Sequence, residues 1–290
     1  MLRAYKYRIY PTEEQKVLLA KTFGCCRFVY NWALKLKIEV YEHEKKSVSY
    51  KTVQDIMVNE LKKDKQWLNE VNSQALLNSI RNLDTAFKNF FRDTHAVGFP
   101  KLKSKKDRQS FQCPQHCVVD FGKGTITIPK VKDIPAVFHR KFKGMVKTVT
   151  ISMTPSRKYF ASVLVDTDIE ELPVTPIHDD TCLGIDLGIK SLAVCSDGRT
   201  FDNPKNLRRS LDRLKLLQKR LSRKKKGSAN RNKARIRVAR LHEHIANCRK
   251  DNLHKITYAL THDSQVRTIC MEDLNVKGMM QNHHLTQEVG

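Results

Sequence analysis

The stretch Thr181-Cys182-Leu183-Gly184-Ile185-Asp186-Leu187-Gly188 decides how the last third of this chain folds. Its apolar residues predict a strand, and the strand carries one carboxylate, Asp186, with Gly188 two residues later. A lone carboxylate inside an apolar strand is costly unless a partner or a metal ion compensates the charge. Because glycine has no side chain, Gly188 would let a phosphate or a metal approach the backbone. The alternative is that Asp186 only caps a turn.

A second pair of carboxylates follows another apolar segment. Val266–Met271 predicts a strand that runs into Glu272 and Asp273. Carboxylates at the ends of two neighbouring central strands can share a Mg²⁺ ion, which prefers oxygen ligands and leaves positions open for phosphate. Since side chains alternate along a strand, Glu272 and Asp273 point to opposite faces, and only one of them faces the metal.

The most basic stretch of the chain lies between these two strands. Residues 203–250 contain 18 Lys and Arg residues, and their only acids are Asp212 and Glu243. Helical spacing of apolar residues predicts two helices joined by a hinge at Arg223–Ser228. A stable solvated face mixes charges of both signs, so a hairpin this cationic indicates contact with nucleic acid. The residues that we assign to this contact are Arg220, Arg223, Lys224, Lys225, Lys226, Arg231 and Arg235.

The composition of the whole chain agrees with that partner. It has 54 Lys and Arg against 30 Asp and Glu, a net charge of +24. Such a surplus opposes compact folding unless a polyanion neutralises it, and DNA or RNA is suited because each phosphate contact releases counterions. An anionic membrane is the other polyanion, but no apolar run approaches the roughly 20 residues of a spanning helix.

The N-terminus and the cysteines predict the compartment. The first residues are charged and lack the apolar core of a signal peptide. The eight cysteines lie mostly in apolar segments, as expected of free thiols in a reducing compartment. Cys113 and Cys117 could bind zinc, but no second pair completes a tetrahedron. We therefore expect a cytoplasmic protein without membrane contact, associated with the nucleoid of a bacterium or archaeon.

Helical periodicity dominates the first third of the chain. Residues 1–11 alternate as a half-buried strand, and Thr12 with Gln15 predicts a capping box at a helix start. Gly24 would end this helix, and a second would follow, which resembles a helix-turn-helix or simply reflects core packing. Further helices near residues 50–63 and after Ser73 complete a helical domain over residues 12–100.

A small antiparallel sheet or barrel is predicted over residues 101–166. Its expected strands are Thr125–Pro129, Val146–Met153 and Tyr159–Val165, and residues 1–11 join them, so the helical domain is an insertion. Residues 167–180, which are acidic and contain two prolines, form a linker to a last domain over residues 181–290. The basic approach to the sheet either follows a phosphate backbone or is a solvated loop; its cations are Lys101, Lys103, Lys105, Lys106 and Arg108.

Together these motifs resemble the TnpB (OrfB) proteins of bacterial insertion sequences, which are relatives of the compact type V CRISPR nucleases. The resemblance covers essentially the whole chain. The matching segments, in the order expected for the family, are Arg3–Pro11, Tyr30–Leu34, Gly98–Lys106, Gly184–Lys190, Leu221–Ser228 and Glu272–Met279.

The resemblance implies an α+β multidomain protein: a wedge barrel interrupted by a helical recognition domain, then a RuvC domain of the RNase H-like α/β fold with the basic helical hairpin. It implies a protein of DNA transposition and recombination that uses a guide RNA from its own element to find and cut target DNA. By position, Asp186 is then the first catalytic and metal-binding carboxylate and Glu272 the second, with Mg²⁺ or Mn²⁺ as the ion.

One departure from the family pattern concerns the end of the sequence. In the family, a zinc ribbon and a third catalytic Asp follow the Glu272 motif, whereas this sequence ends at Gly290. We therefore expect a C-terminally truncated member with an incomplete RuvC domain, no zinc site and impaired cleavage. The alternative is a non-cutting, RNA-guided DNA-binding repressor. An ATPase of the actin and Hsp70 type fits poorly, because no later glycine-rich phosphate loop occurs.

Overall fold

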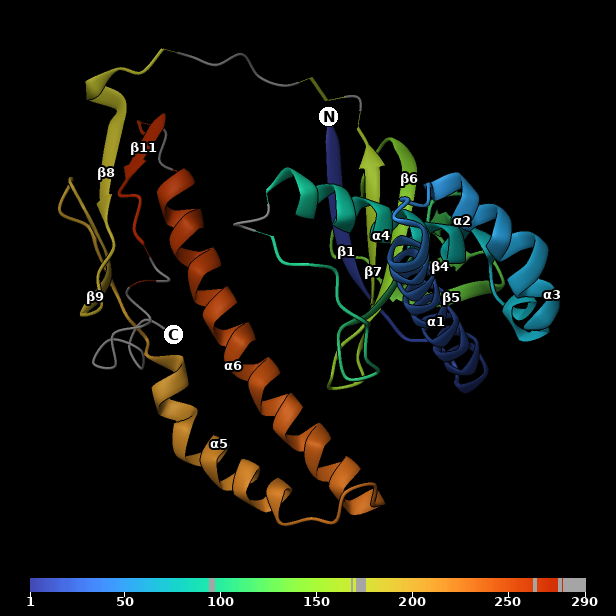
Figure 1. The fold of residues 1–290 in the computed structure, drawn as a ribbon. Coiled ribbons are helices and arrows are strands. Elements are labelled where there is room, and N and C mark those ends of the chain that lie inside the picture. Colours follow the sequence, from blue (N-terminus) through green and yellow to red (C-terminus); the bar gives the residue numbers. More distant parts are fainter. Residues whose placement is uncertain (94–96, 168, 171–175, 263–264, 276–277, 279–290) are drawn as a thin grey trace. The chain divides into compact units, whose positions relative to one another are not determined.

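The chain divides into two compact units, Met1–Glu171 and Leu172–Gly290 (Figure 1). The computed structural model describes residues 1–93, 97–167, 169–170, 176–262, 265–275 and 278. Among these residues, no helix is both long and apolar enough to span a membrane.

A seven-stranded antiparallel sheet forms the framework of the first unit, with the strand order β2-β6-β7-β1-β5-β4-β3. This order leaves β2 and β3 at its two ends, so closure into a wedge barrel stays a prediction. The antiparallel sheet itself is confirmed, although the sequence predicted only four of its strands. The strands are β1 (Leu2–Ile9), β2 (Gln109–Cys113), β3 (Val118–Asp120), β4 (Thr125–Ile128), β5 (Val131–Val137), β6 (Met145–Met153) and β7 (Tyr159–Asp166).

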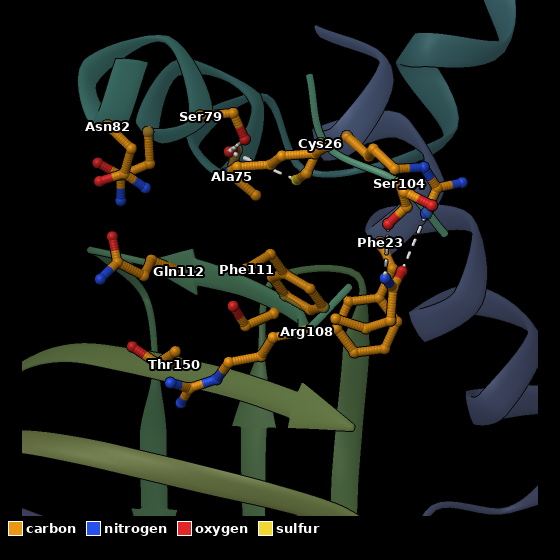
Figure 2. A pocket seen from close by; sticks show the side chains of 15 residues that line it. Phe23, Cys26, Ala75, Ser79, Asn82, Ser104, Arg108, Phe111, Gln112 and Thr150 are labelled. Carbon is orange, nitrogen blue, oxygen red and sulfur yellow. Dashed lines mark hydrogen bonds between the residues drawn. The ribbon is translucent and has the colours of Figure 1, made fainter. Parts of the chain in front are cut away.

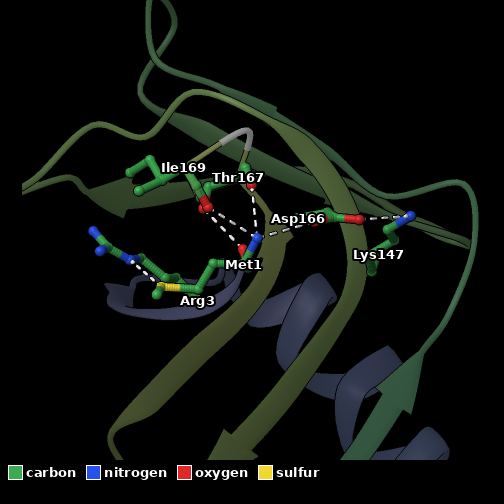
Figure 3. Close-up of polar contacts among 6 residues, drawn as sticks. All are labelled: Met1, Arg3, Lys147, Asp166, Thr167 and Ile169. Atoms are coloured by element: carbon green, nitrogen blue, oxygen red, sulfur yellow. Dashed lines mark hydrogen bonds and ion pairs between the residues drawn. The ribbon is translucent and has the colours of Figure 1, made fainter. Parts of the chain in front are cut away.

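The first strand joins this sheet, as predicted. β1 lies between β7 and β5 and pairs antiparallel with both. Tyr7 and Ile9 are buried while Lys6 is exposed, as the alternation indicated. Figure 3 shows how the start of β1 is tied to the end of β7: the Thr167 hydroxyl donates to the Met1 carbonyl at 2.8 Å. The helices that follow β1 in the chain are therefore an insertion between strands of one sheet.

One unbroken helix, α1 (Glu13–Glu44), replaces the two helices expected at the start of the insertion. The capping box is confirmed, since Thr12 Oγ1 accepts from the Gln15 backbone at 3.3 Å and Gln15 Oε1 accepts from the Thr12 backbone at 2.9 Å. The predicted end of this helix at Gly24 is wrong, because Gly24 lies inside α1. Buried side chains continue on both sides of it, including Phe23 and Cys26. Their packing outweighs the roughly 1 kcal/mol that an interior glycine costs a helix.

The rest of the insertion is helical and shares one hydrophobic core with the sheet. The core cluster includes Phe23, Leu76 and Phe111, from α1, α4 and β2. α1 and α4 contact each other and β2. The helices are α2 (Tyr50–Ile56), the π-helical turn η1 (Met57–Leu61), α3 (Lys62–Asp64), the 3₁₀ turn η2 (Gln66–Glu70) and α4 (Ser73–Arg92).

The second unit contains a four-stranded sheet with the order β10-β9-β8-β11. A 3₁₀ turn, η3 (Asp179–Thr181), precedes it. β8, β9 and β10 pair antiparallel in sequence order, whereas β11 pairs parallel with β8. Parallel neighbours need a crossover connection, which two long helices supply here. The strands are β8 (Cys182–Asp186), β9 (Ser191–Cys195), β10 (Thr200–Asp202) and β11 (Thr268–Met271).

The predicted basic hairpin is present as α5 (Asn206–Ser222) and α6 (Ala229–Thr261) (Figure 1). Its two helices pack around a small core of Leu214, Val238, Leu241 and Ile245. α6 continues beyond the predicted end at residue 250, and Leu260 near its end joins the core of the sheet. One end of α6 therefore packs on β8 and β9 while the other carries the cationic tip.

Candidate functional site

The carboxyl ends of β8 and β11 lie side by side. Their parallel register pairs Met271 with Ile185, so Glu272 and Asp186 are the next residues along the two strands. Both line one open hollow of about 500 Å³, together with Ser196 of the turn after β9 and Cys270 of β11. Asp273 is not among its lining residues. The two carboxylates that the sequence singled out thus share one hollow.

Asp186 is exposed, which corrects the picture of a carboxylate buried inside an apolar strand. Leu183 and Ile185 of the same strand are only 2% and 5% exposed and pack with Leu260 of α6. Because side chains alternate along β8, Asp186 lies on the face away from that core. Its charge therefore carries no burial cost, and the carboxylate is open to an ion from solvent.

The local backbone explains why residue 188 is a glycine. A Cβ at this position would lie 2.9 Å from the Ser191 carbonyl oxygen, so the turn between β8 and β9 requires glycine. The same turn is held by Asn203, whose side-chain amide donates to the Ile189 carbonyl at 3.1 Å. Close approach of a phosphate is thus not needed to explain Gly188.

The donor set suits a hard divalent cation. Mg²⁺ in proteins is commonly held by one or two carboxylates, with water and substrate phosphates completing the shell. Within the described ranges, no cluster of three or more His, Cys, Asp or Glu side chains could hold a metal ion. An ion bound by Asp186 and Glu272 would leave positions open for water or phosphate.

The cysteine pair of the first unit is poorly suited to zinc. Cys113 is fully buried, and the Cys117 thiol donates to the Cys113 carbonyl at 3.5 Å. The hydrogen bond with the Cys117 thiol, together with burial, holds the pKa of Cys113 far above its usual range. Zinc binds the thiolate, so the environment of Cys113 disfavours the form that would be needed, although the hydrogen bond with Cys113 lowers the pKa of Cys117.

The cations predicted on the hairpin separate into three groups. Arg220, Arg223 and Lys224 line an open hollow of about 330 Å³ near the tip. Lys225, Lys226 and Arg235 are exposed outside this hollow. Arg231 points inward instead.

The Arg231 guanidinium is used within the protein. Its Nη1 donates to the carbonyls of Leu221 at 2.9 Å and Lys224 at 2.7 Å. It thereby satisfies carbonyls at the end of α5, a position where a cation is also favoured by the helix dipole.

The cations before the first sheet also differ from one another. Lys101, Lys103, Lys105, Lys106 and Arg108 all have exposed side chains, but Lys103 also contacts α1. The ammonium group of Lys103 lies 3.9 Å from the centre of the Tyr30 ring, and burial there lowers the pKa of Lys103. The Lys103 backbone also exchanges two hydrogen bonds with the Asn31 side chain, at 2.9 and 2.8 Å. Lys103 therefore anchors this segment on α1.

A polar pocket in the first unit was not foreseen. It has a volume of about 120 Å³ and lies between α4, which contributes Ser79 and Asn82, and the sheet strands that carry Gln112 and Thr150 (Figure 2). Arg108, from the basic segment, also lines it.

The side chains that line the pocket are of the types that hydrogen-bond to the edges of nucleic-acid bases. Asn and Gln amides pair with adenine, and Arg pairs with guanine. Asn78 and Ser79 line the pocket although they are only 8% and 7% exposed. The available sequence signal was Asn78 and Asn82, whose spacing of four puts both on one face of α4. The pocket was missed because strand β2, which forms the wall opposite α4, was not predicted.

Two family models match the chain. The model HTH_OrfB_IS605, described as a helix-turn-helix domain, matches residues 1–46, and OrfB_IS605, described as "Probable transposase", matches residues 162–283. The first description differs from the single helix α1 found over that range.

Two bacterial relatives are similar over nearly the whole chain, and both are named as candidate RNA-guided DNA endonucleases. The one from Streptomyces pristinaespiralis is 37% identical over 292 residues, covering 99% of this chain and 70% of that protein. InsQ of Escherichia coli K12 is 34% identical over 280 residues, covering 96% and 67%. Among solved structures, a Cas12f1–sgRNA–target DNA complex aligns with 12% identity and a TM-score of 0.34, covering 99% of this chain and 77% of that one.

Proposed function

The chain belongs to the OrfB (TnpB) family of IS605-type transposon proteins, and on that premise we propose that it is an RNA-guided DNA-binding protein with a metal-dependent nuclease site. The observation that carries the proposal is the pair Asp186 and Glu272 at the carboxyl ends of two parallel strands, lining one open hollow. The connection between those strands is the cationic hairpin, which would bring a phosphate backbone to the same unit.

The proposed partners are a guide RNA from the element and the target DNA that it selects. The net charge of +24 supports a polyanionic partner, and the names of the two relatives support RNA guidance and DNA as the target. The role would lie in DNA transposition and recombination, at the nucleoid of a bacterium or archaeon. The first unit would correspond to the wedge and recognition domains, and the second to part of a RuvC domain.

In the nuclease site, Asp186 and Glu272 would hold Mg²⁺ or Mn²⁺. A divalent ion there would polarise a phosphodiester and lower the pKa of a water molecule. The chain's own contribution is to hold the two carboxylates in adjacent strands. The β8 end is fixed to the turn after β9 by a hydrogen bond from the Gly184 backbone to Ser196 Oγ, at 3.1 Å. Such support keeps a carboxylate positioned before any ion arrives.

Cleavage by a polypeptide of these 290 residues is proposed to be weak. Two-metal hydrolysis uses a pair of ions roughly 3.5–4 Å apart to stabilise the attacking and leaving oxygens. Two carboxylates can hold one ion, whereas a second would be held loosely. The second candidate function is an RNA-guided DNA-binding repressor that does not cut; within the described residues, the hollow offers two carboxylates, Asp186 and Glu272.

The test compares three single-charge changes in the 290-residue polypeptide. Mn²⁺ binding, followed by electron paramagnetic resonance, should be lost in Asp186→Asn and in Glu272→Gln. It should persist in the matched control Asp273→Asn, because Asp273 does not line the hollow. Equal loss in all three variants would refute the assigned ligands. Cleavage of target DNA with guide RNA and Mg²⁺ then separates a nuclease from a repressor.

The polar pocket of the first unit is proposed to read a base edge of the bound nucleic acid. Each well-formed bidentate pair contributes about 1–3 kcal/mol of discrimination against a wrong base. Gln112→Ala should therefore reduce preference at one base position while leaving binding to unrelated sequences unchanged. A uniform loss of affinity across all sequences would indicate that Gln112 contacts the nucleic-acid backbone instead.

A further inference from the structure

The turn between α5 and α6 is held by an internal network rather than left as a free linker. Besides its bonds to Leu221 and Lys224, the Arg231 guanidinium donates to the Ser222 carbonyl at 3.5 Å. Ser228 caps α6 by accepting from the Arg231 backbone at 3.1 Å, and its hydroxyl donates to the Lys225 carbonyl at 2.9 Å. Arg231 thus connects the end of α5, the turn and the start of α6.

The hollow beside this turn gathers four cations over an apolar floor. Arg220, Arg223 and Lys224 come from α5 and the turn, and Arg237 comes from α6. Leu217 and Ala234 supply the apolar part of the lining. Four like charges around one hollow repel one another unless an anion joins them, and guanidinium groups bind phosphate oxygens in a bidentate way. A phosphodiester would neutralise these cations, and the sugar attached to it would pack against the apolar part of the lining.

We propose that this hollow is a preformed site for a single backbone phosphodiester, and that Arg231 is its positioning residue. The inference rests on the proposed nucleic-acid binding and names where one phosphate is held. Arg231 would act through the four lining cations, because its bonds to the turn set the places of Arg223 and Lys224 relative to Arg220 and Arg237. An RNA strand and a DNA strand carry the same phosphodiester chemistry.

The number of phosphates in the hollow can be measured from the salt dependence of binding. For single strands, each neutralised phosphate adds about 0.7 to the slope of log affinity against log salt concentration. Arg220→Ala/Arg223→Ala should lower the slope by about 0.7, since both guanidinium groups share one phosphate. The control Lys233→Ala/Arg240→Ala removes the same charge from exposed positions of α6 outside the hollow.

The probes are a 20-nucleotide RNA and a DNA of the same sequence, titrated at several salt concentrations. A drop on both probes identifies the phosphodiester itself, and a drop confined to RNA identifies an RNA strand as the occupant. If the hollow variant and the control variant have equal slopes on both probes, the site is refuted.

The positioning role of Arg231 is tested by a double-mutant cycle. Arg231→Ala should weaken binding by on the order of tenfold in the wild-type chain, the loss expected for a charge-assisted contact. In the Arg220→Ala/Arg223→Ala background it should cause a clearly smaller loss, because two of the four cations through which it acts are gone. Arg231→Lys should restore part of the affinity, since an ammonium can donate to the same carbonyls.

Different binding results would contradict the proposed nucleic-acid binding and the positioning role of Arg231. A wild-type chain that binds neither probe contradicts nucleic-acid binding altogether. A chain that binds with steep salt dependence, but loses affinity equally on Arg231→Ala in both backgrounds, contradicts only the positioning role. That result would show that Arg231 acts by general destabilisation of the hairpin.

Discussion

Replacing Gly24 by alanine should stabilise the first unit. Gly24 lies inside α1, and beyond the adjacent residues and backbone of this helix no atom comes within 4 Å of a Cβ built on it. An interior glycine costs a helix roughly 0.5–1 kcal/mol relative to alanine, because it loses more backbone freedom on folding. Gly24→Ala should therefore raise the free energy of unfolding by about that amount. For a unit of this size, the melting temperature should rise by about 1–4 °C.

A helix-turn-helix at this point predicts the opposite sign. If Gly24 were a left-handed C-cap, alanine would be strained there by about 1–2 kcal/mol. Gly124 provides the matched control in the same unit. Its φ is +69°, and the nearest atom to a built Cβ is 3.9 Å away, so Gly124→Ala tests backbone strain without a steric clash.

The assay is thermal unfolding of the full chain, followed by circular dichroism, with the transition of the first unit identified from Gly124→Ala. Gly24→Ala should raise the midpoint of that transition while Gly124→Ala lowers it. A decrease of similar size in both variants would refute the continuous helix and favour a turn at Gly24.

Three further predictions concern stability. Tyr7→Phe should lower the free energy of unfolding in urea by about 1 kcal/mol, because the buried hydroxyl donates to the Arg140 carbonyl at 2.8 Å; an unchanged midpoint would contradict that bond. Gly144→Ala should destabilise by about 3 kcal/mol, since φ is +124° and a Cβ would collide with the Asp166 carbonyl oxygen; a melting temperature equal to wild type would argue against this backbone path. Burial lowers the pKa of Lys103, so at this residue the unfolded chain holds more protons between that pKa and 10.5, and the contribution of Lys103 to stability rises with pH through this window. The urea midpoint of the wild type relative to that of Lys103→Met should therefore rise up to pH 10.5, and a constant difference would contradict this; the comparison with Lys103→Met is needed because burial raises the pKa of Cys25 and Cys26, which acts in the opposite direction.

The sequence by itself predicted the features that depend on neighbouring residues. The alternation of β1, the capping box at Thr12 and the two helices of the basic hairpin all follow from local periodicity and local hydrogen bonds. The strand ends that carry Asp186 and Glu272 were also apparent, because each carboxylate follows an apolar run. These signals need only a few consecutive residues to be read.

Only the tertiary structure decided how those pieces are used. Strands β2 and β5 went unpredicted, because each pairs with a strand distant in the chain, β2 with β6 and β5 with β1. Gly24 continues a helix because core packing outweighs its intrinsic preference. Asp186 proved exposed because α6 covers only the opposite face of β8. Arg231 looked like its cationic neighbours, yet the path of the turn brings three backbone carbonyls to its guanidinium. In each case the deciding contact joins residues that no local pattern connects.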